Sequence, residues 1–461
     1  HEDSRFVVQS FNPKTRQLAL LTKEYLPVRA LLFDTATTIL LQYKDKLVEL
    51  ELTRKLKTPR TNQVPGLVCA ACVDQNVLTL CRTDAGAVLT DRPTGVPAIV
   101  VTDVPAAYRR LASAVSGDQP QVNRIAVAVP GGRPQAARLL GRVLARHGPT
   151  VLPRGGPNPG DVCETLLSGD AGTRFLVTEL DARRRGEIAM MLPVVRPRIG
   201  VAIGTGGAHR DILGTRLPAL GELAEGLPAD AVAVLDCDDP ATASLAARTQ
   251  ARVVTFGRHR SARVRAERIV LDGQARARFR LQTPAGSAEV ALQLHGDHYV
   301  PAALAAAAVA LEHTHDVWLV ADALGSATPE AGTALRERPD GVTVLDDAAD
   351  AAPEAVLAAL RTLLSVAAGR RRTVAVLGQL TGLGASAAAV HARIGRAATR
   401  MGVDELIAVG GPDAARYGGT HALNRAAAAS LLEDLLKPGD VVLVAGAADP
   451  SLTGVADLLS S

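Results

Sequence analysis

The spacing of apolar residues changes along this chain. Before residue 58, short β-branched and aromatic runs alternate with polar residues, as in RFVVQSF, RALLFD and TTILLQY. A period of two is typical of strands with one buried face. From residue 124, continuous apolar runs such as RIAVAV, RFLVTEL, RIGVAIG, AVAVLD and RVVTFG alternate with Ala- and Leu-rich stretches of helical length. This alternation predicts a parallel sheet with helices on both faces.

A second set of strand-like runs begins near residue 341, in the order GVTVLDD, RTVAVLG, ELIAVG and DVVLVAG. Helical stretches separate them, which predicts a second, doubly wound α/β domain. Between the two sets, residues 278–296 read as a hairpin and the stretch PAALAAAAVALE as a long helix. Residues 325–341 have no clear apolar period and are predicted to be a linker.

Composition narrows the class of protein. The net charge is only +4 over 461 residues, which argues against a nucleic-acid partner. No apolar run reaches 18 residues, so no membrane span is expected. Five cysteines without a regular framework favour a reducing compartment, and we expect a cytoplasmic protein. Six of the seven lysines lie before residue 58, and the last is Lys437.

The segment from Arg124 to Arg146 reads as strand, glycine turn and helix. In that arrangement backbone N–H groups and a helix N-terminus can face an anion. Gly131 and Gly132 form the turn, but Arg133 and Pro134 stand where a phosphate loop has lysine and a hydroxyl residue. The segment is therefore either a plain strand-to-helix turn or an anion site that relies on Arg133.

Several blocks resemble the Mur ligase family in the family's own order, and are closest to the members that add D-alanyl-D-alanine (MurF). TPRTNQVPGLV and GAVLTDRPTGVPAIVVTDV are similar to the UDP-substrate domain. RPRIGVAIGTGGAHRDILGTR, AVAVLDCDDPA and GDHYVPAALAAAAVALE are similar to the central ATPase domain. GVTVLDDAADAAPEAVLAAL, RTVAVLGQLTGLG, HARIGRAA and KPGDVVLVAGA are similar to the C-terminal domain.

The resemblance implies a three-domain α/β architecture, with a small UDP-substrate-like domain at 58–120, a central parallel-sheet ATPase-like domain at 121–326 and a doubly wound C-terminal domain at 327–461. Residues 1–57 would form an additional, divergent β-rich segment.

The resemblance also implies roles for individual residues. Glu179 and His209 would be catalytic, and Glu179 would also bind magnesium. The nucleotide would be bound by residues of the phosphate loop, the central domain and the C-terminal domain, which are Gly131, Gly132, Arg133, His298, Asp346 and Asp347. Arg60 and Asn158 would contact the UDP substrate. The alternative, which is the more common one for a lone carboxylate in such a position, is that Glu179 is a relic or a helix-capping carboxylate.

Other family positions are replaced. Leu223 stands where the family has a carbamoylated lysine, and Ala445 where it has a late lysine. Gly204 and Ala302 stand where it has asparagines. Because the replaced residues are those that touch phosphate, metal or dipeptide, we expect a catalytically inactive homologue that binds or regulates a partner in peptidoglycan precursor metabolism.

The alternative is an active ATP-dependent amide ligase that joins an amino acid or dipeptide to a UDP-N-acetylmuramoyl peptide. In the inactive case we expect no cofactor, with ATP and Mg²⁺ bound only if the altered site still works. We also expect a protein partner or a homo-oligomer, formed through residues 1–57, and allow for a UDP-sugar peptide as ligand.

Overall fold

The computed structural model describes nine short strands before residue 101 and most of the chain after it. The described residues beyond 100 are 101, 103–117, 119–129, 134–181, 185–204, 217–328, 334–348, 352–380, 383–446 and 452. The early strands form two sheets, ordered β1-β9-β8-β7 and β2-β3-β4-β5-β6. Their bounds are β1 Val7–Val8, β2 Phe11–Asn12, β3 Gln17–Leu18, β4 Val28–Leu32, β5 Thr38–Tyr43, β6 Lys46–Glu51, β7 Val77–Leu80, β8 Ala87–Thr90 and β9 Ala98–Val100.

The centre of the molecule is a nine-stranded sheet in the order β11-β12-β10-β13-β14-β15-β16-β17-β18. Neighbours from β11 to β16 pair in parallel, whereas β17 and β18 continue the sheet as an antiparallel hairpin. The strands are β10 Asn123–Val129, β11 Thr150–Val151, β12 Phe175–Asp181, β13 Ile199–Ala202, β14 Val232–Asp236, β15 Arg252–Gly257, β16 Val264–Leu271, β17 Arg276–Thr283 and β18 Gly286–His295. The expected strands and hairpin are confirmed, with the parallel sheet extended into a mixed one.

Helices cover both faces of this sheet. Along β10, Ala126 and Ala128 face a core shared with α1, α3, α4 and α6, while Ile125, Val127 and Val129 face a core shared with α2, α8 and α9. This strict alternation follows from the period of two in a strand. The helices are α1 Val104–Gly117, α2 Pro134–Ala145, α3 Pro159–Leu167, α4 Glu187–Val195, α6 Leu217–Gly226, α7 Pro240–Ala243, η2 Ser244–Arg248, α8 Tyr299–Ala310 and α9 Val317–Ser326.

The C-terminal part holds a six-stranded sheet in the order β19-β20-β24-β21-β22-β23, with only β19 antiparallel to its neighbour. One core lies between this sheet and α10 and α11, and a second lies on the face of α12. The elements are β19 Ala334–Glu337, β20 Thr343–Asp347, α10 Pro353–Ala367, β21 Thr373–Gly378, η3 Gly384–Ser386, α11 Ala387–Met401, β22 Glu405–Val409, η4 Ala414–Tyr417, β23 Thr420–Ala422, α12 Arg425–Leu435 and β24 Val441–Ala445.

One expectation about this region was wrong. The presumed linker 325–341 contains β19, which pairs with β20 in an antiparallel register. β19 is an edge strand with half-buried and exposed side chains, so it lacks the apolar run that marks the central strands. This segment is a strand because its backbone pairs with β20 on one side, and not because its side chains are buried.

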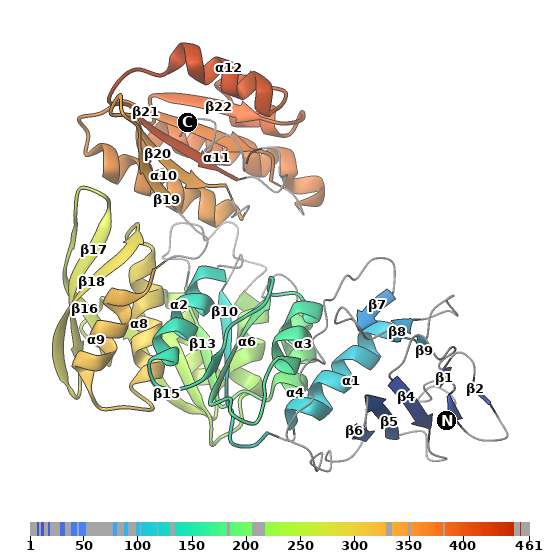
Figure 1. Cartoon of the computed structure of the whole chain (residues 1–461). Helices are drawn as coiled ribbons and strands as arrows, with labels where there is room; N and C mark the ends of the chain where they lie inside the picture. Colours follow the sequence, from blue (N-terminus) through green and yellow to red (C-terminus); the bar gives the residue numbers. More distant parts are fainter. Residues whose placement is uncertain are drawn as a thin grey trace.

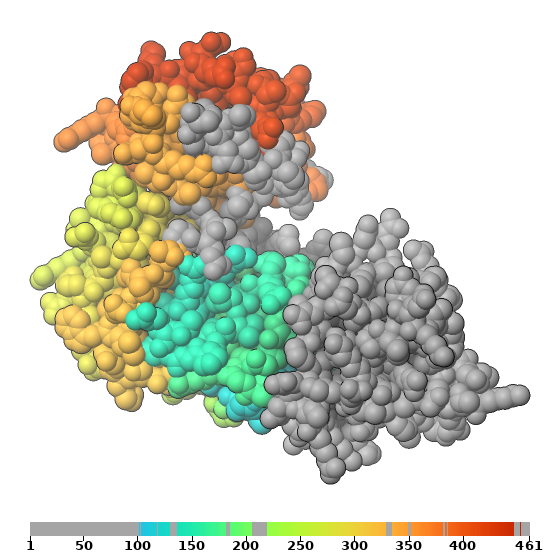
Figure 2. Space-filling view, in the orientation of Figure 1, coloured from blue at the N-terminus to red at the C-terminus, as the bar shows by residue number. Residues whose placement is uncertain are grey.

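The two large sheets meet at the turn between β16 and β17. Ala275 in that turn is fully buried within the core of the C-terminal part, beside residues of α10. Figure 1 shows β16 and β17 extending on one side toward the C-terminal sheet, and Figure 2 shows the two bodies in contact there. This turn therefore attaches the central sheet to the C-terminal sheet.

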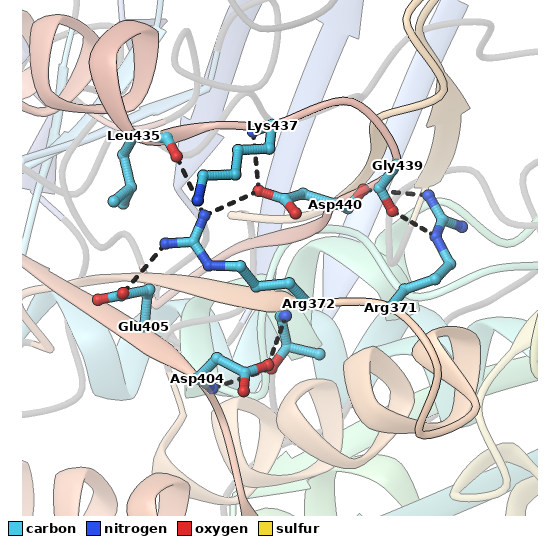
Figure 3. Close-up of polar contacts among 9 residues, drawn as sticks. Arg371, Arg372, Asp404, Glu405, Leu435, Lys437, Gly439 and Asp440 are labelled. Atoms are coloured by element: carbon cyan, nitrogen blue, oxygen red, sulfur yellow. Dashed lines mark hydrogen bonds and ion pairs between the residues drawn. The ribbon is translucent and has the colours of Figure 1, made fainter.

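Two adjacent arginines form hydrogen bonds that connect the amino ends of the C-terminal strands. Arg371 donates to the carbonyl oxygens of Gly439 and Gly341 at 2.6 and 2.7 Å. Arg372 contacts the carboxylates of Asp440 and Glu405 at 3.2 and 3.0 Å (Figure 3). The starts of β20, β21, β22 and β24 are thereby linked at the edge opposite their carboxyl ends.

Candidate functional site

The carboxyl ends of the parallel strands define the candidate site of the central sheet, as in other open α/β sheets. Glu179 lies inside β12, two residues before its end, and pairs in register with Val127. It therefore shares the sheet face of Val127, which α2 and α8 cover. Its side chain is only 2% exposed. Glu179 is therefore a buried carboxylate on the face of the sheet that α2 covers.

The strand and helix that flank the candidate phosphate loop are present. β10 ends at Val129 and α2 begins at Pro134, a residue suited to the first helical turn. Gly131, Gly132 and Arg133 lie outside the described residues, as do His209 and Arg60. Their assigned roles stay predictions.

A buried carboxylate that the sequence reasoning missed lies at the end of β14. Asp236 accepts hydrogen bonds from the backbone N–H groups of Gly204 at 3.1 Å and Asp238 at 3.0 Å. Burial raises its pKa to about 6, although the two N–H donors oppose that shift. The sequence signal that could have identified this carboxylate is its position, because Asp236 is the polar residue that ends the apolar run AVAVLD.

Gly204 occupies a crowded position next to this carboxylate. A Cβ atom there would lie 2.3 Å from the Cβ of Asp239, which caps α7 through the N–H group of Ala241 at 2.9 Å. The site therefore has no room for the asparagine that the family carries at this position. The DDP motif that follows therefore has structural roles: Asp239 caps α7, and Asp238 accepts from the backbone N–H groups of Arg258 at 2.6 Å and His259 at 2.9 Å in the turn after β15.

His298 lies where the central sheet approaches the C-terminal part. It occupies the N-cap position of α8, and its ring centroid is 4.3 Å from that of Tyr299. A Cβ atom at Gly296 would lie 2.4 Å from His298 Nδ1 and 2.6 Å from Thr362 Oγ1 of α10. His298 is thus placed near the helix that follows Asp346 and Asp347.

Asp346 and Asp347 end β20 at the carboxyl edge of the C-terminal sheet. Asp346 accepts from the N–H of Ala348 at 3.2 Å and lies 4.0 Å from the guanidinium of Arg336. Asp347 is 7% exposed. Strand-end carboxylates at this edge are suited to a nucleotide contact, which stays a prediction.

Asn158 has a local structural role. Its side chain caps α3 by accepting from the N–H of Asp161 at 3.0 Å, and its amide donates to the Asp161 carboxylate at 2.6 Å. Ncap asparagine is a common helix-starting device. The predicted substrate contact of Asn158 is neither required nor tested by this geometry.

The described residues contain no group of three or more His, Cys, Asp or Glu side chains that could hold a metal ion. Mg²⁺ needs no such group, because it often takes one or two protein carboxylates and fills its other positions with water and substrate phosphates. Glu179 therefore fits the role of a single magnesium ligand.

In the same part of the chain, no helix is long and apolar enough to cross a bilayer.

Family models match most of the region after residue 139. Residues 140–310 match the Mur ligase middle domain, and residues 333–448 match the Mur ligase glutamate ligase domain. The UDP-N-acetylmuramoyl-tripeptide–D-alanyl-D-alanine ligase of Mycobacterium tuberculosis is 37% identical over 432 residues, which cover 81% of this chain and 84% of that protein. The chain belongs to the Mur ligase family.

Three further comparisons agree with this membership in the Mur ligases. The Escherichia coli ligase of the same name is 28% identical over 335 residues, covering 71% of this chain and 73% of that protein. A crystal structure of MurF from Acinetobacter baumannii superposes with a TM-score of 0.69 at 26% identity, covering 80% of this chain and 83% of that one. MurF from Thermotoga maritima in complex with ADP has a TM-score of 0.67 at 20% identity, covers 80% of this chain and 86% of that chain, and supports the fold alone.

The expectation of a catalytically inactive, non-enzymatic homologue was wrong. The 37% identity extends over 432 residues, including the central and C-terminal regions, and it is shared with a Mur ligase named for its activity. The inactive interpretation gave decisive weight to a few replaced positions. At the phosphate loop, moreover, Arg133 preserves the cation, so that replacement alone is no evidence of a lost function.

Proposed function

We propose that this Mur ligase is an active ATP-dependent peptide ligase that joins D-alanyl-D-alanine to a UDP-N-acetylmuramoyl tripeptide. The observation that carries the proposal is the 37% identity, over 81% of the chain, to the mycobacterial ligase with that name. In such a reaction ATP phosphorylates the peptide carboxylate, the dipeptide amine attacks the acyl phosphate, and phosphate leaves.

The proposal assigns the nucleotide to the carboxyl edge of the central sheet. Gly131 and Gly132 would offer backbone N–H groups to the phosphates, and Arg133 would supply the cation. A guanidinium presents a planar fork of donors that matches phosphate oxygens, although it is not isosteric with a lysine ammonium group. Glu179 would hold Mg²⁺, which neutralises phosphate charge when bound.

The remaining assignments belong to the substrates. His209 would act at the reacting centre, and His298, Asp346 and Asp347 would contact the nucleotide from the central and C-terminal parts. Arg60 and Asn158 would contact the UDP-sugar peptide. We also propose the division at 58–120, 121–326 and 327–461, and a cytoplasmic location, where ATP and these precursors are available. A protein partner for residues 1–57 stays a separate prediction.

The direct test is a ligation assay with the purified full chain. UDP-N-acetylmuramoyl tripeptide, D-alanyl-D-alanine and Mg-ATP are incubated together, and the pentapeptide product is measured by mass spectrometry with ADP release in parallel. We expect product only when all three substrates and Mg²⁺ are present. Absence of product and of substrate-dependent ADP release, under conditions in which an authentic MurF turns over, would refute the proposal.

Variants test the assigned cation and metal ligand. Arg133→Ala and Glu179→Gln should each lower kcat about 100- to 1000-fold, because each removes an electrostatic stabiliser of the transferred phosphate. Arg133→Lys should retain most of the rate, since the charge persists. Arg263→Ala is the matched control, as it removes an exposed arginine from the loop before β16. Equal rates in Arg133→Ala and Arg263→Ala would show that Arg133 has no role in the proposed site.

A further inference from the structure

Three arginines gather at the edge of the central sheet opposite the candidate active site. Arg124 precedes the first residue pair of β10 and β13, and Arg198 lies directly across from it, since the N–H of Arg198 donates to the carbonyl of Arg124 at 2.9 Å. Neighbouring residues of a parallel pair point to the same face. Arg196 follows α4 in a left-handed conformation with φ of 49°.

The hydrogen bonds of these arginines go to neutral groups. Arg124 Nη1 donates to the carbonyls of Ser116 and Gln119 at 2.8 and 3.1 Å. Arg196 donates to the Pro193 carbonyl at 3.1 Å and to the Ser113 hydroxyl at 3.3 Å, and Arg198 donates to the Pro120 carbonyl at 3.0 Å. Carbonyls at the ends of α1 and α4 stabilise the cations in part. Within the described part of the chain, the other guanidinium donors of Arg196 and Arg198 have no hydrogen-bond partner.

No carboxylate of the described residues lies within ion-pair distance of the three guanidinium groups. Arg124 is only 8% exposed, and its buried Nε has no hydrogen-bond partner there. Burial lowers the pKa of Arg124, and the charges of Arg196 and Arg198 lower it further. Like charges held together in this way are a cost to the folded state that a bound anion would offset.

The exposed arginines open into a cleft of about 600 Å³ between α4 and α6. Arg196 and Arg198 are among its lining residues, and Leu192, Pro193 and Pro228 supply apolar wall. Two of its acidic residues are already engaged. Glu222 accepts from backbone N–H groups at the start of α4, and Glu225 pairs with Arg248 at 2.6 Å. Asp230 is the remaining carboxylate in the lining.

We propose that Arg196 and Arg198, supported by Arg124, form a binding site for a phosphate group, either free or carried by a small metabolite whose body lies in the α4–α6 cleft. The guanidinium forks of two arginines that line one cleft can share the oxygens of one phosphate. A cleft of about 600 Å³ is within the usual size of small-molecule sites. The site is separate from the proposed nucleotide site because it lies at the amino ends of β10 and β13, not their carboxyl ends.

The test is calorimetric titration of the full chain at about 0.15 M salt, which screens weak surface attraction. The probes are inorganic phosphate and glycerol 3-phosphate. The double variant Arg196→Gln/Arg198→Gln removes both charges but keeps amide donors for the neighbouring carbonyls. Arg248→Gln is the control for an arginine outside the cleft lining, since Arg248 is neutralised by its ion pair with Glu225. Thermal melting confirms that each variant is folded.

We expect saturable binding to wild type and to Arg248→Gln, and at least tenfold weaker binding to the double variant. Tighter binding of glycerol 3-phosphate than of phosphate would identify a metabolite as the ligand, whereas equal binding would identify free phosphate. Undiminished binding in the folded double variant would place any phosphate elsewhere and overturn the proposal. So would an absence of saturable binding of both probes to wild type.

Discussion

Replacing Asp440 by alanine should loosen the C-terminal sheet at the amino ends of its strands. The side chain of Asp440 is 5% exposed. It accepts from the N–H of Lys437 at 2.9 Å and from Arg372 Nη1 at 3.2 Å (Figure 3). The substitution removes two hydrogen bonds to a carboxylate, one from a backbone N–H and one from a guanidinium, and leaves both donors without this acceptor.

The magnitude follows from those two bonds. A hydrogen bond to a charged group contributes about 1.5 kcal/mol at the lower end of its usual range, so the loss of two should be about 3 kcal/mol. The loss of stability should not exceed this value, because Arg372 is not left as a buried, unpaired charge. Its side chain is 25% exposed, and it keeps its contacts with Glu405 and the Leu435 carbonyl. Glu405→Ala is the matched control. Glu405 is 42% exposed, and its exposed ion pair should contribute about 1 kcal/mol or less.

Hydrogen exchange read by mass spectrometry suits this test, because a multidomain chain does not unfold in one step. Peptides covering β20, β21 and β24 should exchange about 100-fold faster in Asp440→Ala, as expected for about 3 kcal/mol. Peptides of the central sheet should be unchanged. Equal exchange in Asp440→Ala and Glu405→Ala would refute the reasoning, because burial of the pair would then contribute nothing.

Two further predictions concern packing and pH. Gly395→Ala should destabilise the C-terminal sheet by several kcal/mol, because its Cβ would lie 1.7 Å from the Tyr417 carbonyl oxygen, and a shifted urea midpoint of the C-terminal transition checks this. Burial lowers the pKa of both His147 and His313, so the unfolded chain takes up protons first as pH falls below about 6.5. Stability should be full above that pH and decrease below it. His147→Gln/His313→Gln should flatten the dependence of melting temperature on pH between 7.5 and 5.5, and an unchanged slope would contradict this.

The buried strands were predictable because they are sandwiched between two layers of helices. RIAVAV, AVAVLD, RTVAVLG and DVVLVAG correspond to β10, β14, β21 and β24. Each is apolar on both sides, so the sequence pattern and the burial have the same cause. β19 was missed because an edge strand is specified by pairing to a neighbour, and a single sequence does not display that pairing.

The candidate site was less predictable, because its polar residues have several physical explanations. Asn158 fits a substrate contact and a helix cap equally well on sequence, and only the bond to the Asp161 N–H shows the second role. Asp236 was overlooked because nothing in the run AVAVLD reveals that the N–H of Gly204 faces it. Positions that depend on distant backbone groups need the three-dimensional structure.

The arginine in the phosphate loop has to be judged against the whole chain. Between Lys57 and Lys437 there is no lysine at all, and arginine supplies the cation in the ion pairs reported for the described residues. In this part of the chain, arginine is therefore the residue used wherever a positive charge is needed, for structure or for catalysis, and Arg133 follows that rule. A replacement that occurs throughout residues 58–436 carries no information about one site within them. Leu223 and Ala445 do lack a charge, but Leu223 is 2% exposed and Ala445 fully buried, so both are explained by packing in their helix and strand. The absence of lysine from the central part of the chain, which favoured an inactive protein, is thus equally consistent with a ligase that relies on Arg133.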